Sequence, residues 1–339
     1  MTTTRRLLLT GGTCAAIGLS VGRDLLAEVA EAAGETMSFV QGPPVADRPL
    51  RRISPHVFMI RSPDGFPTAE NQGMMSNITF VVGEKGVVVV DSGASVQIAR
   101  MAVRQLKAMT AKPVVGIVNT HYHGDHWLGN HGFVEVFGED LPRWAHPATR
   151  AAIEGETGSF WHESMVKWTS GATMGTRIVA PNLDVGHGFE ISLGDVGLRL
   201  HHYGRAHTPC DLSVEVIEDG VTCVGDVLMD HRIANMDDGS FRGTLDTLDR
   251  LTAATKTTVW LPAHGDAGVA VLKWHRDLFE GIWESCVRAV EEGIPLDGAL
   301  AFALSDPRVS SQAAVTGGWE RNIGKYVSIA YLEAEQAQF

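Results

Sequence analysis

The chain has 339 residues, of which 44% are hydrophobic and 20% charged, and its formal net charge is -12 at pH 7. This length is sufficient for one large α/β core or two moderate ones. No basic block offsets the negative charge, so we expect a small-molecule substrate and no nucleic-acid or anionic membrane partner.

The first 33 residues resemble an export signal more than part of a fold. Arg5 and Arg6 precede a short apolar stretch rich in small residues that runs to Val21, and residues 30–32 read Ala-Glu-Ala, a typical cleavage site. The paired arginines predict the twin-arginine route, and therefore a periplasmic or otherwise exported protein. The stretch is too short and too often interrupted for a stable membrane span. An ordinary amphipathic N-terminal helix is the alternative.

Residues 34–53 are rich in Pro, Gly and Arg and are predicted to form a linker. Beyond them, β-branched runs bounded by turn residues predict strands, and apolar residues at helical spacing predict helices. The predicted strands are 56–61, 77–82, 86–91, 114–119, 198–203, 212–217, 221–225 and 258–261. The predicted helices are 95–109, 148–168, 243–256 and 270–292. Two similar halves of strands and helices therefore predict two central sheets flanked by helices.

A cluster of potential metal ligands directly follows the predicted strand 114–119. His121, His123, Asp125 and His126 lie within six residues, and Gly124 allows a tight backbone between them. Loops at strand ends are where a rigid sheet presents functional side chains. Imidazole and carboxylate are ligands that zinc prefers, so the cluster predicts one or two metal sites.

Three further potential ligands follow later predicted strands. His207 comes after strand 198–203, Asp226 after strand 221–225, and His264 after strand 258–261. Singly, each is a weak signal, because lone histidines and strand-final aspartates are common. Together with the first cluster they are numerous enough to complete two metal shells.

This arrangement resembles the metallo-β-lactamase superfamily, whose signature is HxHxDH followed by a later His, an Asp and a final His. The resemblance covers residues 54–265 and includes Asp91, at the position of a family aspartate that supports the metal loop. It implies a four-layer αββα sandwich over residues 54–266, with a helical extension, 267–339, packed on the same domain. It also implies two zinc ions. His121, His123 and His207 would bind the first, Asp125, His126 and His264 the second, and Asp226 would bridge them.

The resemblance implies hydrolysis by a zinc-bound hydroxide, with Asp125 orienting the nucleophile and moving its proton. We expect an ester, thioester or lactam of a small molecule as substrate. Asp226 stands where dedicated β-lactamases place Cys or Ser, which favours a broader hydrolase. The segments 125–130 and 322–335 are most similar to exported zinc metallohydrolases that accompany quinoprotein and sulfur-oxidation systems, and the ligand set also matches glyoxalase II-like hydrolases.

Several alternatives stay open at this level. A mono-iron persulfide dioxygenase shares much of the motif, so iron is possible, and a dedicated β-lactamase or a non-catalytic metal-binding protein would also fit. Tyr122, Trp127 and Tyr203 are candidate substrate contacts, although aromatic packing would explain them equally well. Walls of the substrate pocket are expected from loops 62–76, 155–185 and 229–242. The oligomeric state is not indicated by the sequence.

Overall fold

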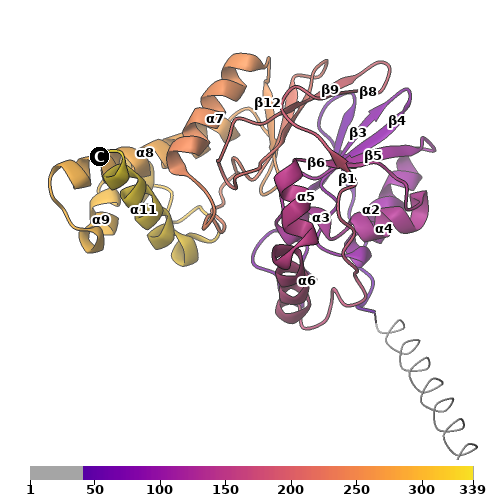
Figure 1. The fold of residues 1–339 in the computed structure, drawn as a ribbon, viewed down its shortest axis with the longest axis horizontal. Coiled ribbons are helices and arrows are strands. Elements are labelled where there is room, and N and C mark those ends of the chain that lie inside the picture. Colours follow the sequence, from indigo (N-terminus) through magenta and orange to yellow (C-terminus); the bar gives the residue numbers. More distant parts are fainter. Residues whose placement is uncertain (1–40, 339) are drawn as a thin grey trace, which may run out of the picture. The chain divides into compact units, whose positions relative to one another are not determined.

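Two β-sheets packed face to face lie at the centre of the computed structural model, which describes residues 41–338 (Figure 1). From Gly42 onward the chain forms one compact unit. The predicted export signal, residues 1–33, and the first part of the predicted linker lie outside the described residues. No helix within residues 41–338 is both long and apolar enough to cross a membrane.

The first sheet has seven strands in sequence order. Its first four strands are antiparallel neighbours and its last four are parallel neighbours, with β4 common to both sets. The strands are β1 (Leu50–Arg52), β2 (Val57–Ile60), β3 (Ile78–Gly83), β4 (Gly86–Val90), β5 (Val114–Val118), β6 (Arg143–Ala145) and β7 (Leu183–Asp184). Every residue of β4 is buried, as expected for a valine-rich strand covered on both faces.

The second sheet has five strands in the order β12-β11-β10-β9-β8. The strands are β8 (Glu190–Ser192), β9 (Gly197–His201), β10 (Ser213–Val216), β11 (Val221–Gly225) and β12 (Val259–Pro262). Strand β12 pairs in parallel with β11, and the other neighbours are antiparallel. Valines and leucines of both sheets share one buried cluster, which forms the central layer of the core.

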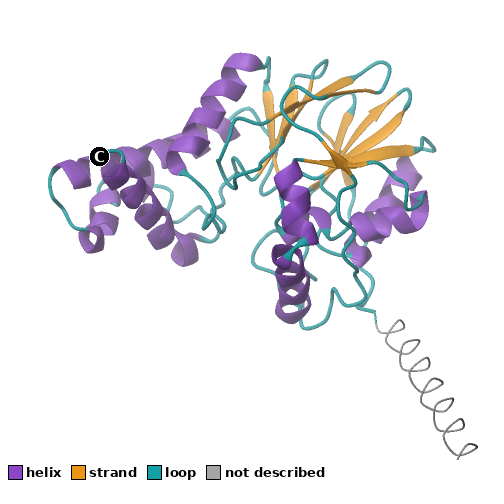
Figure 2. Cartoon of the chain, in the orientation of Figure 1, coloured by secondary structure: helices purple, strands orange, loops and turns teal. Residues whose placement is uncertain are grey.

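Helices cover the outer faces of both sheets (Figure 2). Helices α2 (Val96–Met109) and α4 (Asn130–Phe137) share a core with the first sheet, whereas α7 (Phe241–Ala254) packs on the second. The side chain of Ser95 caps α2 by accepting from the backbone N–H of Ile98. These layers form the predicted αββα sandwich.

The remaining helices lie in two groups. The helices α3 (Gly124–Trp127), α5 (Pro147–Glu154) and α6 (Glu156–Trp168) follow the first sheet's later strands. The C-terminal group has its own apolar core and comprises α8 (Val271–Glu291), α9 (Leu296–Ala303), α10 (Pro307–Ser310) and α11 (Trp319–Gln336). Phe241 stacks on Phe279 of α8 with ring centroids 4.6 Å apart, which joins this core to α7.

Three local predictions differ from the structure. The predicted linker 34–53 contributes strand β1, and its Val45 is buried in the core beneath the first sheet. The predicted helix 148–168 is two helices that meet at Gly155. The first turn of the second helix lies so close to the end of the first that only glycine fits at position 158. A Cβ there would lie 1.9 Å from the carbonyl oxygen of Ile153. Helix α4, which was not predicted, follows the ligand loop.

Candidate metal centre and active site

The loop after β5 carries the first four candidate ligands. His121 lies in a bend after β5 and His123 is the extended residue that precedes helix α3, which begins at Gly124, so Asp125 and His126 lie in the first turn of a short helix. Helix α6 packs directly on this turn, because a Cβ at Gly124 would lie 3.0 Å from the Cβ of Trp161. The glycine therefore allows the close approach between the ligand loop and α6.

The structure brings all seven predicted ligands together. His207 follows β9, Asp226 follows β11 directly and His264 lies two positions after the end of β12, and each is buried beside the loop after β5. The seven side chains form two groups, and within each group the possible ligand atoms lie within 4.8 Å of one another. The first group is His121, His123, His207 and Asp226, and the second is Asp125, His126 and His264.

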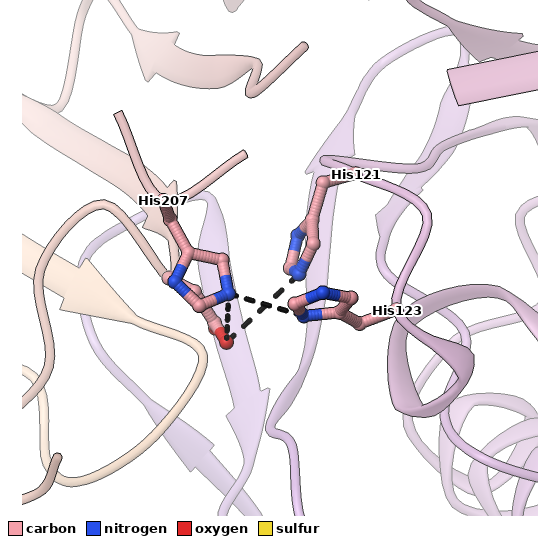
Figure 3. Close-up of side chains that lie close together, drawn as sticks. His121, His123 and His207 are labelled. Carbon is pink, nitrogen blue, oxygen red and sulfur yellow. Dashed lines mark hydrogen bonds and ion pairs between the residues drawn. The ribbon is translucent and has the colours of Figure 1, made fainter. Parts of the chain in front are cut away.

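In the first group, three imidazoles converge on one point (Figure 3). The Nε2 atom of His207 lies 3.1 Å from Nδ1 of His123. The Oδ2 atom of Asp226 lies 3.4 Å from that Nε2 atom and 3.9 Å from Nε2 of His121. Two ligands of one tetrahedral zinc lie about 3.3 Å apart when each bond is about 2.0–2.1 Å long. The spacing is therefore that of atoms sharing a cation.

In the second group, Oδ2 of Asp125 lies 3.3 Å from Nε2 of His126 and 3.4 Å from Nε2 of His264. Asp226 contacts this group as well, with Oδ1 3.6 Å from His126 Nε2 and Oδ2 3.3 Å from His264 Nε2. Asp226 thus lies within 4 Å of imidazole nitrogens in both groups.

Four of the inward-facing atoms are fully buried and have no hydrogen-bond partner among the described residues. They are His121 Nε2, Asp125 Oδ2, His126 Nε2 and Asp226 Oδ1. Buried polar atoms left in this way are costly, and a cluster of them facing a common point fits a bound cation. The residues present therefore fit the two-metal site that their sequence pattern predicts.

The electrostatics of the cluster divide the histidines into two kinds. The adjacent carboxylates outweigh burial and raise the pKa of His126 and His264 well above 6.5, so binding of a cation there would release a proton from each ring. Burial lowers the pKa of His123 to about 4 and that of His207 to about 3, so both rings are neutral at pH 7 and can act as ligands. Burial also opposes ionisation of Asp125 and Asp226. The adjacent His126 and His264 outweigh that effect and hold the pKa of both carboxyl groups well below its usual range.

Asp91, directly after β4, orients one histidine of each ligand group through hydrogen bonds on the side of the ring away from the metal site. It accepts hydrogen bonds from His126 Nδ1 at 2.8 Å and from the backbone N–H and the hydroxyl of Thr120, each at 2.9 Å. Because the hydroxyl of Thr120 donates to Asp91, its oxygen accepts from His121 Nδ1 at 3.1 Å. Both histidines therefore carry their proton on Nδ1 and direct the Nε2 lone pair at the centre. The supporting role that the resemblance implied for Asp91 matches these contacts.

Sequence reasoning did not identify Asp64, which supports His264 in the same manner. Its Oδ1 lies 3.3 Å from Nδ1 of His264 and 3.4 Å from Nε of Arg232. The backbone of Asp64 is left-handed, with φ 63°, a conformation that aspartate tolerates better than most residues. No ligand spacing in the sequence marks this residue, because it lies 200 positions from its partner.

One cavity lies beside the ligands and a second one adjoins it. A cavity of about 390 Å³ is lined by Tyr122 and His123, and also by Glu156, Thr157, Phe160, Trp161, Asn235, Asp237 and Asp238. The hydroxyl of Tyr122 donates to Asp238 at 2.8 Å, and burial together with that hydrogen bond raises the pKa of Tyr122 above its usual value. A second cavity of about 660 Å³ shares four of these residues, Phe160, Trp161, Asn235 and Asp237.

Two of the three candidate substrate contacts are corrected by the structure. Trp127 has no exposed surface and packs in the core, where its indole N–H donates to the carbonyl of Tyr122 at 2.9 Å, so it cannot contact substrate. Tyr203 lines neither cavity and packs on His187 with ring centroids 5.0 Å apart. Tyr122 does line a cavity, beside His123.

Comparison with known proteins agrees with the fold. The family model described as the metallo-beta-lactamase superfamily matches residues 71–305. The chain belongs to the metallo-β-lactamase superfamily. Membership in this superfamily, together with the buried ligand cluster, identifies it as a metal-dependent hydrolase.

Several solved structures share the fold at low sequence identity. A metallo-β-lactamase from Pontibacter korlensis aligns with a TM-score of 0.54 at 20% identity, over 68% of this chain and 98% of that one. A metallo-β-lactamase from Erythrobacter litoralis gives 0.51 at 20% identity, over 68% and 95%. A stereoselective inverting sec-alkylsulfatase from a Pseudomonas species gives 0.61 at 17% identity, over 84% of this chain and 50% of that one. The chain thus spans about half the length of the alkylsulfatase.

Proposed function

We propose that the protein is a dinuclear zinc hydrolase that cleaves an ester, thioester or lactam bond in a small molecule. The observation that carries this proposal is the position of Asp226. Its carboxylate lies 3.3–3.9 Å from imidazole nitrogens of both ligand groups, as a bridge between two ions requires. A site for one ion has no use for the three additional ligands of the second group.

Each ligand group would hold one zinc ion. His121, His123 and His207 would bind the first, Asp125, His126 and His264 the second, and Asp226 would bridge the two. Zinc bound in this way supplies a water acidified towards neutral pH and polarises the bond to be cleaved. The set contains only imidazole and carboxylate, which suits zinc, and iron can also use these ligands.

Asp125 is the chain's best candidate for moving the proton of the attacking water. Its Oδ2 is fully buried and accepts no hydrogen bond from a described residue, and the adjacent histidines keep the carboxylate ionised. A carboxylate held in this state can accept a proton and orient the molecule that carries it. Tyr122 would line the substrate side, since its hydroxyl is fixed by Asp238 in the cavity beside His123.

A dedicated β-lactamase is the less favoured reading, because an aspartate stands at position 226. The similarity to a sec-alkylsulfatase suggests adding a sulfate ester to the substrates tested. We also propose that Arg5 and Arg6 direct export of the folded protein through the twin-arginine route, so that hydrolysis takes place outside the cytoplasm.

The test is a hydrolysis screen with nitrocefin, a thioester, aryl esters and an alkyl sulfate. We expect at least one of them to be hydrolysed by the wild type and by Asp266→Ala. We expect Asp226→Ala to lose that activity. Asp266 is the matched control because it is a surface aspartate that pairs with Arg51 and Arg61. A zinc-loaded protein inert towards the whole panel, or full activity in Asp226→Ala, would contradict the proposal.

A further inference from the structure

The cavity beside His123 and the larger cavity share part of their lining and therefore adjoin each other. Phe160, Trp161, Asn235 and Asp237 line both of them. The smaller cavity reaches His123, and the larger one extends away from it to helix α11. Cavities of 300–1,000 Å³ are typical for small-molecule ligands. The substrate thus has a site for its reacting bond and a second site for the rest of its structure.

The larger cavity has an apolar, aromatic side. Trp168 lies 5.2 Å from Phe66 and 5.9 Å from Trp161, measured between ring centroids, and Phe160 lies 5.9 Å from Trp161. Met75 completes this surface. Phe160 is 57% exposed although it lies directly beside a hydrophobic cluster, so an apolar ligand would bury surface that water now contacts.

Cationic side chains also line the larger cavity, and two of them come from the C-terminal helix. Arg321 and Lys325 of α11 line it together with Arg232. Lys325 pairs with Asp237 at 3.3 Å, and Arg232 pairs with Asp64 at 3.4 Å. Arg321 pairs with no carboxylate of the described chain and instead lies over the ring of Phe66, with its guanidinium carbon 4.1 Å from the ring centre.

Arg321 is therefore a cation without a carboxylate partner among residues 41–338, and it lines a cavity that is partly aromatic, in a protein whose net charge is -12. The ring of Phe66 holds the guanidinium by a cation–π contact and leaves its N–H donors free. Such donors form a fork that fits a carboxylate in a bidentate geometry. The Phe66 loop also carries Asp64, so the same segment contacts both Arg321 and the ligand His264.

We propose that the substrate is an amphiphilic carboxylate. Its labile bond lies at the metal ligands, its apolar body lies against Trp161 and Phe160, and its carboxylate binds Arg321. This inference rests on the proposed function, because it specifies the substrate class of that same site. The helical extension thus acts as the specificity wall of the active site.

The first experiment measures how the zinc-loaded protein hydrolyses two ester substrates that differ only in the charge of their terminal group. The esters are 4-nitrophenyl octanoate and the 4-nitrophenyl monoester of octanedioic acid. We expect kcat/KM to be about tenfold higher for the monoester, mainly through KM, because a charge-assisted hydrogen bond contributes at about that level. Arg321→Gln should abolish this preference, and Arg321→Lys should retain part of it.

Arg288→Gln is the matched control. Arg288 is an exposed arginine of α8 that lies over the ring of Phe302 in α9, and it lines neither cavity. This control variant should keep the wild-type preference. A second variant, Phe160→Ser, changes an exposed side chain and should raise KM for both esters. No preference for the monoester in the wild type, or an equal preference in Arg321→Gln, would overturn the inference while the hydrolase itself stands.

A binding measurement separates this inference from the proposed function. Titration with 4-phenylbutyrate should quench tryptophan fluorescence in the wild type and in Arg288→Gln, with about tenfold weaker binding in Arg321→Gln. The neutral 4-phenylbutanol should show no difference between these variants. If no ester is hydrolysed but this pattern appears, the cavity assignment holds and the proposed reaction fails. Equal binding of 4-phenylbutyrate by all three proteins would refute the assignment.

Discussion

Replacing Asp91 with Asn exchanges one oxygen of a buried carboxylate for an NH2 group and changes little else. The carboxylate accepts from His126 Nδ1 at 2.8 Å on one oxygen and from the backbone N–H of Thr120 at 2.9 Å on the other. Whichever way the amide is turned, its NH2 group meets one of these N–H donors. Asparagine also tolerates the left-handed backbone at this position, where φ is 56°.

The expected loss of metal affinity follows from that mismatch. A buried donor left without an acceptor costs about 1–3 kcal/mol, and changing a partner of a metal-bound histidine lowers metal affinity about 10–100-fold. A flipped tautomer of His126 would point an N–H at the ion, and the bond from Thr120 to His121 would weaken as well. We therefore expect Asp91→Asn to weaken zinc binding in both ligand groups by about 10–100-fold.

The assay is zinc titration of metal-free protein in competition with a chromophoric chelator, with circular dichroism to confirm folding. Asp64→Asn is the comparison, because Asp64 contacts only His264 among the ligands, at 3.3 Å. It should weaken one of the two binding steps and by a smaller factor. Wild-type affinity in a folded Asp91→Asn protein would refute the reasoning.

Three further predictions concern stability, pH and export. Trp127→Ala, which empties a fully buried site, should lower the free energy of unfolding by about 3–5 kcal/mol in chemical denaturation. The hydrogen bond to Asp219 raises the pKa of His56 above 6.5 in the folded protein. The interaction between the protonated His56 and Asp219 therefore stabilises the fold fully below pH 6.5, and this stabilisation is lost as the pH rises through the raised pKa. The stability difference between wild type and His56→Gln should accordingly be larger at pH 6 than at pH 8.5, and equal differences would contradict this. Replacing both Arg5 and Arg6 with Lys should retain the protein in the cytoplasm on cell fractionation, and unchanged export would remove the twin-arginine assignment.

The sheets and the ligands were predictable from sequence because both depend on local patterns. Valine-rich runs such as residues 86–91 mark strands that are buried on both faces. Ligands placed directly after such strands are brought to one edge of the sandwich. His207 and His264 could therefore be assigned although they lie 57 positions apart in the sequence.

Features that depend on how distant segments pack were not predictable. Trp127 flanks a ligand in the sequence just as Tyr122 does, and the direction in which α3 turns decides that one is core and the other lines a cavity. All three segments expected to form the pocket walls contribute lining residues, but those from 155–185 lie in helix α6 and not in a loop. Arg321 comes from a helix almost 200 residues beyond the ligand loop. A single arginine on an amphipathic helix has no local signal that distinguishes it from a surface residue.

The central claim is that seven side chains hold two zinc ions that the reaction requires. The most direct test is metal quantification of the purified protein, joined to hydrolysis measured while metal is removed and restored. We predict two zinc ions per chain, activity lost on chelation, and activity regained as the second equivalent of zinc returns. One iron per chain with oxygen consumption on a persulfide, or full hydrolysis by metal-free protein, would contradict the claim.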